Sequence, residues 1–169
     1  EGSLAETAQQ VTATATQAFT VERASIWILE PTSHALYCLD SYERSGNRHT
    51  QEATLSQTEF PTYFAALGCE DVIPAAQVQQ ESNFQELVAN VLTPRCVTSR
   101  LDASIRTKEG LAGVVSIEHT GPSREWAPDE QQFAQALANF MALVLEAARR
   151  RESEDALALA KTAAEDATK

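Results

Sequence analysis

Aromatic side chains gather between residues 42 and 84, and they are the residues of this sequence best suited to binding a small molecule. Short helices packed over a sheet, with several aromatic and few charged side chains, form the mostly apolar cavity that small ligands use. In this interpretation two tyrosines supply the polar ends of the cavity. The candidate pocket residues are Tyr42, Phe60, Tyr63, Phe64, Phe84, Leu87, Leu101, Ala103 and His119. The alternative is that these side chains form plain hydrophobic core.

No residues spaced for catalysis accompany this aromatic group. The sequence contains no Gly-x-Ser-x-Gly, no phosphate-binding loop and no His-x-x-x-His, and its acidic residues are scattered. The cysteines, Cys38, Cys69 and Cys96, are widely spaced and have no histidine at metal-ligand distance. We therefore expect no enzyme activity in this domain, no metal site, and reduced cysteines that act as small apolar fillers. Thiol chemistry is the alternative for the cysteines.

Asp102, Glu118 and His119 each have a ligand-binding and a structural interpretation, whereas Trp126 has a structural one. Asp102 could contact a ligand, but the structural alternative is an ion pair, with Arg124 as its partner. Glu118 and His119 end a predicted central strand, where they could reach a cavity mouth or form edge hydrogen bonds. Trp126 directly precedes the last helix, which favours a role in fixing the entry of that helix.

Composition limits the classes of protein to which the chain can belong. It has 169 residues, of which 43% are hydrophobic, and a net charge of −11. This favours one soluble globular domain with a real core, located in the cytoplasm or cut from a longer cytoplasmic protein. The low pI and the lack of a basic stripe argue against nucleic-acid binding. No segment has the length of a membrane span or the layout of a signal peptide.

Hydrophobic periodicity predicts the elements that position these residues. Branched and aromatic residues that alternate, or that run together, indicate strands, and apolar residues at helical spacing indicate helices. The expected order is a helix over 4–19, strands over 23–30 and 35–43, an edge strand near 52–55, short helices over 60–67 and 84–92, strands over 99–107 and 111–119, and a long helix from Pro128.

The two terminal helices carry apolar seams of the kind that pair in coiled coils. In the last helix the seam is Phe133, Leu137, Phe140 and Val144, and a charged block over 149–155 follows it. Apolar residues resume at Leu157, one position out of phase, which a stutter or a kink must absorb. We therefore divide the chain into a domain over 1–148 and a coiled-coil helix over 149–169, and expect a homodimer through the terminal helices.

Three segments in the second half of the chain resemble the C-terminal half of a GAF domain. They are Leu101-Asp-Ala-Ser-Ile, Gly110 to Gly121, which contains Gly-Val-Val-Ser-Ile-Glu-His, and Arg124-Glu-Trp-Ala-Pro-Asp-Glu. Further similarity lies in segments 21–29, 60–64 and 84–87, so the resemblance covers about residues 4–150. The most similar version is that of bacterial sensor histidine kinases and diguanylate cyclases.

The resemblance implies an α+β fold. A central, mostly antiparallel sheet would have the terminal helices on one face and short helices on the other. It also implies a small-molecule site between the sheet and the short helices, dimerisation through the first and last helices, and no enzyme activity in the domain itself.

Several departures from the family patterns argue against particular cofactors. Cyclic-nucleotide-binding GAF domains have an Asn-Lys pair, which this chain lacks although it has Asp129-Glu130. Bilin-binding GAF domains have a cysteine commonly followed by histidine, and no cysteine here is followed by one. No motif supports haem. We therefore expect no bilin, haem or cyclic nucleotide.

These observations together predict a regulatory GAF sensor domain of a bacterial signal-transduction protein, of the two-component kind. It would bind an unidentified small molecule and relay the signal through its dimeric C-terminal helix to an output kinase or cyclase domain. One alternative is a ligand-free GAF domain that serves only as a dimerisation scaffold. Another is an enzyme like the thiol-based free methionine sulfoxide reductases, although the cysteine contexts of that family are missing.

Overall fold

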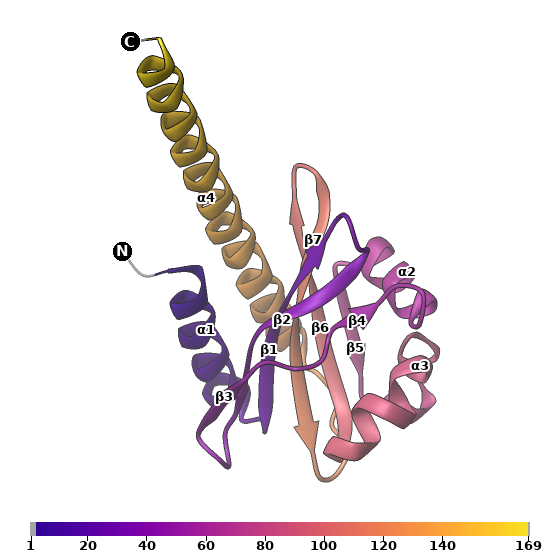
Figure 1. Cartoon of the computed structure of the whole chain (residues 1–169). Helices are drawn as coiled ribbons and strands as arrows, with labels where there is room; N and C mark the ends of the chain where they lie inside the picture. Colours follow the sequence, from indigo (N-terminus) through magenta and orange to yellow (C-terminus); the bar gives the residue numbers. More distant parts are fainter. Residues whose placement is uncertain (1–2, 169) are drawn as a thin grey trace.

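In the part of the chain that the structure describes, seven strands form one antiparallel sheet, with helices on both of its faces (Figure 1). The computed structural model describes residues 3–168. In chain order the α-helices and β-strands are α1 (Leu4–Phe19), β1 (Arg23–Glu30), β2 (Ala35–Glu43), β3 (Arg48–Thr50), β4 (Leu55–Ser56), α2 (Pro61–Cys69), β5 (Val72–Ala75), α3 (Gln85–Leu87), β6 (Val97–Thr107), β7 (Gly110–Thr120) and α4 (Pro128–Ala167). The short turns of helix are η1 (Val78–Gln80), η2 (Ser82–Phe84), η3 (Val88–Leu92) and η4 (Thr93–Arg95).

The strand order is β3-β2-β1-β7-β6-β5, and β4 pairs with the far end of β2. Helices α1 and α4 pack on one face, and α2, α3 and the short turns pack on the other (Figure 1). This arrangement confirms the α+β class and the division of helices that the sequence predicts. Among the described residues, no helix is long and apolar enough to cross a membrane.

Strand alternation divides the core into two layers. The terminal-helix layer, between the sheet and α1 with α4, contains Leu101, Ala103 and Ile105 of β6. The short-helix layer, between the sheet and α2 with α3, contains Trp27 and Val114 together with the buried aromatic residues of α2 and η2. Because successive side chains of a strand point to opposite faces, the residues of β6 between those three face the short-helix layer.

A bulge in β2 changes which of its residues face which layer. Ile26 of β1 lies opposite Asp40, but its neighbour Trp27 lies opposite Cys38, so β2 contains one extra residue at this point. Before the bulge Cys38 belongs to the short-helix layer. After it Tyr42 lies opposite Ala24, which belongs to the terminal-helix layer. The bulge therefore turns Tyr42 away from the other candidate pocket aromatics.

The segment expected to be one amphipathic helix over 84–92 is instead built of short 3-10, α and π turns. Phe84, Leu87 and Leu92 are each fully buried, whereas Val91 is only partly buried. The wider π turn brings Leu92 into the core in place of Val91.

Helix α4 is continuous from Pro128 to Ala167 and extends well beyond the sheet (Figure 1). The charged block over 149–155 therefore does not break it. Residues 150–168 are all exposed, so this part of the helix adds no side chain to the buried core. The phase shift of the apolar seam occurs within an unbroken helix.

Candidate functional site

A buried arginine lies at the centre of the short-helix layer. Arg100 of β6 is the largest fully buried side chain among the described residues, with 2% of its side chain exposed. Its Nε donates to Asp102 Oδ1 at 2.9 Å, and its Nη2 donates to Ser116 Oγ at 2.9 Å and to the Tyr63 hydroxyl at 3.2 Å. A buried charge is tolerated only when it is paired and hydrogen-bonded, and this arginine is both.

Aromatic rings from two short helices cover the Arg100 guanidinium. Its central carbon lies 5.6 Å from the centre of the Phe84 ring and 5.7 Å from that of Tyr63. The Tyr63 hydroxyl donates to Asp102 Oδ2 at 2.5 Å. These contacts join α2 and η2 to β6 through polar as well as apolar interactions. We call Arg100, Asp102, Tyr63, Ser116 and Phe84 the buried arginine network.

The protonation states of this network follow from burial and charge. Burial, and then the Asp102 carboxylate, raise the pKa of Tyr63 far above its usual range, so the phenol stays neutral. Burial alone would lower the pKa of Arg100, but Asp102 and Glu118 outweigh it and raise this pKa further. The network therefore contains the Arg100 cation, which pairs with the Asp102 carboxylate and lies near that of Glu118, and the neutral Tyr63 phenol.

A second charged cluster adjoins the network, nearer the β2–β3 end of the sheet. Glu52 Oε1 lies 3.9 Å from Arg23 Nε and 3.3 Å from Arg95 Nη1. The same Arg95 nitrogen lies 3.2 Å from Glu118 Oε1, which is 3.8 Å from Arg100 Nη1. We call Arg23, Glu52, Arg95 and Glu118 the charged ring, which is joined to the buried arginine network through Glu118.

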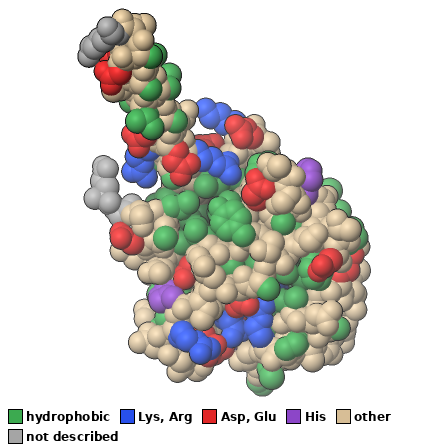
Figure 2. Space-filling model, in the orientation of Figure 1, with side chains coloured by type: hydrophobic (Ala, Val, Ile, Leu, Met, Phe, Trp, Pro, Cys, Tyr) green, Lys and Arg blue, Asp and Glu red, His purple; other side chains and the backbone are tan. Residues whose placement is uncertain are grey.

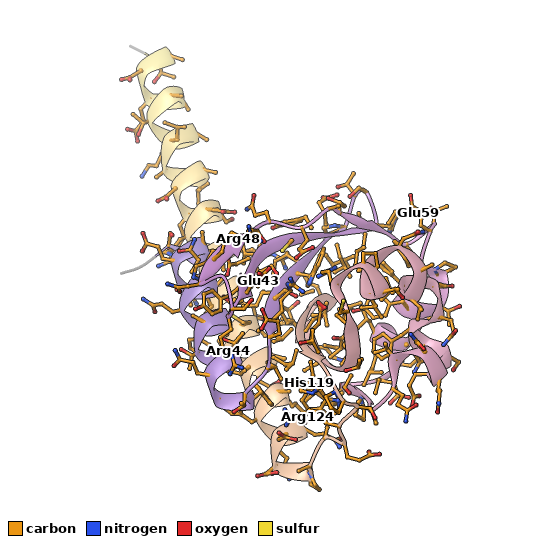
Figure 3. The ribbon with its side chains drawn as sticks, turned by 90° about the horizontal axis from the view of Figure 1, so that it is seen from below. Glu43, Arg44, Arg48, Glu59, His119 and Arg124 are labelled. Carbon is orange, nitrogen blue, oxygen red and sulfur yellow. The ribbon has the colours of Figure 1, made fainter. Side chains whose placement is uncertain are left out.

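Strand register places these charges side by side. Glu43 of β2 lies opposite Arg23 of β1, Arg23 lies opposite Glu118 of β7, and Glu118 lies opposite Arg100 of β6. The row therefore alternates in charge across four adjacent strands. At its outer end Arg48 of β3 pairs with Glu43 at 3.3 Å, and Figure 3 shows these two side chains together. In Figure 2 basic and acidic side chains gather over this part of the molecule.

The structure brings together only part of the candidate pocket. Five of its residues share the short-helix layer, namely Phe60, Tyr63, Phe64, Phe84 and Leu87. Leu101 and Ala103 lie on the opposite face of the sheet, which corrects their predicted place beside Tyr63. The reason is the two-residue period of β6, which directs Arg100 and Asp102, and not the residues between and after them, toward α2. Whether any of the nine residues contacts a ligand stays a prediction.

Two other candidate pocket residues also lie apart from this group. The hydroxyl of Tyr42 donates to Asn47 Oδ1 at 2.8 Å, and its ring packs 4.7 Å from that of His49. His119, near the end of β7, has Nε2 3.0 Å from the carbonyl oxygen of Pro122. Figure 3 shows His119 next to Arg124.

The predicted ion pair between Asp102 and Arg124 does not form. Asp102 pairs with Arg100, two residues away on the same face of β6. Arg124 instead pairs with Glu130, donates to the Phe19 carbonyl oxygen, and lies 4.5 Å from the centre of the Trp126 ring. Trp126 is buried and donates from Nε1 to the Ala75 carbonyl oxygen at 3.2 Å, so it anchors the start of α4 as expected.

Sequence reasoning did not identify Arg100, Ser116 or any basic member of the charged ring. The position of Arg100 in its strand could have identified it. Arg100 and Asp102 are two residues apart and share one face of β6, and in a strand covered on both faces such buried charges must pair with each other or with other buried groups. The sequence interpretation paired Asp102 with Arg124 and gave Arg100 no partner. It therefore did not bring these two charges together.

The cysteines lie in different environments. Cys38 is buried in the short-helix layer, and burial raises the pKa of its thiol to about 11, so it is protonated and a weak nucleophile at neutral pH. Cys69 and Cys96 are exposed thiols at the ends of α2 and η4. No group of histidine, cysteine or carboxylate residues within 3–168 is arranged to hold a metal ion.

Comparison with known proteins gives one family for the chain and several similar solved structures. The family model described as GAF domain matches residues 3–145. The GAF domain of PixJ from Thermosynechococcus elongatus, in its blue-light absorbing form, is similar with a TM-score of 0.74 and 15% identity, covering 92% of this chain and 90% of that one. The GAF domain of a phosphoenolpyruvate-protein phosphotransferase from Coxiella burnetii has a TM-score of 0.72 and 17% identity, covering 90% and 88%. No curated protein matches the chain.

A third similar structure corrects the expectation about cofactors. It is a far-red absorbing dark state with bound biliverdin, similar with a TM-score of 0.66 and 14% identity, covering 82% of this chain and 86% of that one. Proteins of this fold thus hold bilins, and the exclusion of a bilin from the missing Cys-His motif is overturned. In this chain Tyr63, Phe84 and Leu87 are fully buried, so a group of that size would require the short helices to move outward.

Proposed function

Because this chain belongs to the GAF domain family, which acts in regulation, we propose that it senses a small molecule in its short-helix layer and relays binding through α4. The observation that carries the proposal is the position of the buried arginine network. It joins α2 and η2 to β6 and β7, and β6 packs its other face against α4. A change on the short-helix side is therefore one strand away from the output helix.

The path from the network to α4 runs through alternate residues of β6. Arg100 and Asp102 face the short helices, and Leu101 between them packs in the terminal-helix layer with Met141 and Leu145 of α4. Close packing transmits small displacements because it leaves little free volume to absorb them. A ligand that binds two arrangements of the network unequally would shift the position of α4.

Helix α1 has its own polar connection to the sheet. Thr12 Oγ1 donates to Asp40 Oδ2 at 2.6 Å, and His49 Nδ1 lies 2.8 Å from the same oxygen. Asp40 is 4% exposed at its side chain, so this link is well shielded from water. Both terminal helices are thus fixed to the sheet whose other face holds the candidate site.

The outward face of α4 supports a homodimer. Ala134, Ala138, Met141 and Leu145 are buried against the sheet, whereas Phe133, Phe140 and Leu143 are 40%, 46% and 67% exposed. Figure 2 shows hydrophobic side chains gathered where α4 leaves the domain. An exposed apolar stripe of this kind typically marks a protein contact, and a second copy of the chain can cover it through its own stripe.

The proposal extends to the host protein and its output domain. The continuous, exposed helix over 150–168 is suited to connect the domain over 1–148 to an output domain. A histidine kinase or a diguanylate cyclase in a two-component-type pathway is the output that the sequence resemblance favours. The domain itself is regulatory and carries no catalytic role in this proposal.

Native mass spectrometry of the purified chain tests the proposal directly. We expect a dimer that carries additional noncovalent mass, compared with the bare mass of the denatured chain. Samples prepared with and without added biliverdin would determine whether a bilin is among the ligands, with visible absorbance as a second readout. A monomer would contradict the proposed dimer. A dimer that carries no additional mass, both when isolated from cell extract and after addition of biliverdin, would contradict the sensor role.

A ligand-free dimerisation scaffold is the second candidate function. The observation that favours it is the closed packing of the short-helix layer, where Tyr63, Phe84 and Leu87 are each 0% exposed. A scaffold would show the same hydrogen-exchange protection in α2 and α3 in cell extract and in buffer. A sensor would show greater protection of these helices when its ligand is present.

A further inference from the structure

The charged ring is closed on three sides and open on the fourth. Contacts link Arg23 to Glu52, Glu52 to Arg95, and Arg95 to Glu118, at 3.9, 3.3 and 3.2 Å. Arg23 and Glu118 lie directly opposite each other on β1 and β7, yet they form no ion pair with each other.

Each of these two residues has one polar atom without a partner. Arg23 Nη1 and Glu118 Oε2 are both buried, and neither forms a hydrogen bond within residues 3–168. The Glu118 side chain is 1% exposed and that of Arg23 is 11% exposed. Buried polar atoms are nearly always paired. A donor without an acceptor and an acceptor without a donor, on two residues that lie opposite each other on neighbouring strands, therefore indicate a group that binds between them.

We propose that the Arg23–Glu118 side of the ring is a binding site for a neutral ligand group that accepts and donates a hydrogen bond together, such as a carboxamide or a hydroxyl. The acceptor of that group accepts a hydrogen bond from Arg23 Nη1, and its donor donates one to Glu118 Oε2. This inference rests on the proposed sensor function and names the ligand chemistry at one end of its site.

The charges of the ring give the site its selectivity. Two arginines and two glutamates balance each other, so a neutral group leaves that balance intact. A carboxylate or phosphate would accept from Arg23 but place negative charge beside Glu118 Oε2, which needs a donor. An ammonium group would satisfy Glu118 but leave Arg23 Nη1 without an acceptor. Leaving a buried group unpaired is strongly unfavourable, so both kinds of charged group are rejected.

Access to the site is through irregular backbone. Glu52 belongs to the coil over 51–54 between β3 and β4, in which Gln51, Ala53 and Thr54 are exposed. Arg95 is at the end of η4, next to Cys96 in the left-handed conformation. Neither segment is held in a strand ladder, so both can move without breaking the sheet.

A set of probes that share one ring and differ in a single group tests the proposal on the full chain. The probes are benzamide, benzyl alcohol, benzoate and benzylamine, titrated at millimolar concentration while amide resonances of β1 and β7 are followed by NMR. We expect benzamide and benzyl alcohol to shift the resonances of Arg23, Glu118 and their neighbours. Benzamide should bind about tenfold more tightly than benzoate, the ratio that one mismatched buried hydrogen bond produces.

A substitution of Glu118 should reverse this preference. In Glu118→Gln an amide nitrogen can replace Oε2, so the site presents two donors and one negative charge fewer. Benzoate should then bind more tightly than benzamide. Glu59→Gln is the matched control: it removes the same charge from an exposed residue that Figure 3 shows on the far side of the domain from Glu43 and Arg48. It should keep the wild-type preference.

Other outcomes would overturn the proposal. Equal shifts with all four probes would mean nonspecific binding, and no shifts would mean that one structural water satisfies the two atoms. If Glu118→Gln does not fold, Glu52→Gln on the exposed coil decides: benzamide should still bind, and benzoate should be less strongly rejected. If extra mass is found on the native dimer while these probes fail, the sensor function stands and only this inference is wrong.

Discussion

Replacing Asp102 by asparagine should destabilise the protein far more than the same change at a comparable surface ion pair. Asp102 is fully buried and provides one oxygen to Arg100 Nε at 2.9 Å and the other to the Tyr63 hydroxyl at 2.5 Å. Asparagine keeps one acceptor oxygen, and its amide nitrogen, itself a donor, takes the place of the oxygen that accepted the second hydrogen bond. It also removes the nearest counter-charge of Arg100, leaving Glu118 at 3.8 Å.

The expected cost of Asp102→Asn is about 3–5 kcal/mol of unfolding free energy, the typical effect of removing one partner from a buried ion pair. Asp71→Asn is the control, because Asp71 also accepts from an arginine Nε, that of Arg106, at 2.8 Å, but is 63% exposed at its side chain. Its cost should be below about 1 kcal/mol. Urea unfolding followed by circular dichroism measures both variants, and equal costs would refute the argument that burial determines the strength of this network.

Three other changes have clear expected outcomes. Gly113→Ala should cost at least about 2 kcal/mol, because a Cβ there would lie 2.1 Å from a backbone oxygen of β1, while Gly68→Ala, with nothing within 4 Å, should be neutral or slightly stabilising in thermal unfolding. Phe140→Glu should convert the dimer to a monomer in analytical ultracentrifugation, and Leu159→Glu, on the exposed tail, should not. Glu86 accepts from the N-terminal backbone of α2, and although burial would raise its pKa, these hydrogen bonds outweigh burial and lower it below 4.5. Its stabilising effect is therefore present above that pH and lost as the pH falls toward the lowered pKa, so Glu86→Gln should flatten this part of the stability profile in acid titrations.

The arrangement of elements was predictable because both of its signals are local. Alternating and branched residues marked β1, β2, β6 and β7 close to their observed bounds, and helical spacing marked α1 and α4. The order of these elements and their resemblance to one family then fixed the layers. Predicting this arrangement did not require knowledge of which strands pair with one another.

The site was less predictable because its geometry depends on which layer each strand face contacts. Both faces of β6 are covered, so Leu101 and Asp102 are equally buried. Alternation in the sequence separates them but does not say which face meets α2. The bulge beside Cys38 adds a second change of face that carries Tyr42 to the other layer, and nothing in the local sequence marks it.

The same limit explains the error about cofactors. The Cys-His motif reports covalent attachment of one group in one part of the family. The fold that surrounds such a group depends on the sheet and the short helices, which this chain shares with a structure that holds biliverdin. The absence of the motif therefore argues only against that covalent attachment, and not against the binding of a bilin by this fold.

The phase shift in α4 leads to a last prediction. In a straight helix the 13 positions from Val144 to Leu157 turn the chain by about 220° beyond three full turns, so the two apolar stripes face nearly opposite directions. One partner helix cannot cover both stripes on the same side. Inserting one alanine after Arg151 brings Leu157 within about 40° of Val144 and should tighten the dimer and lengthen its coiled coil, measured by sedimentation and helical circular dichroism. The same insertion after Ala167 leaves the stripes unchanged and is the control. If both insertions left dimer affinity alike, the stripe over 157–167 would not pair with the partner's helix, and the relay through α4 would have to end before Arg149.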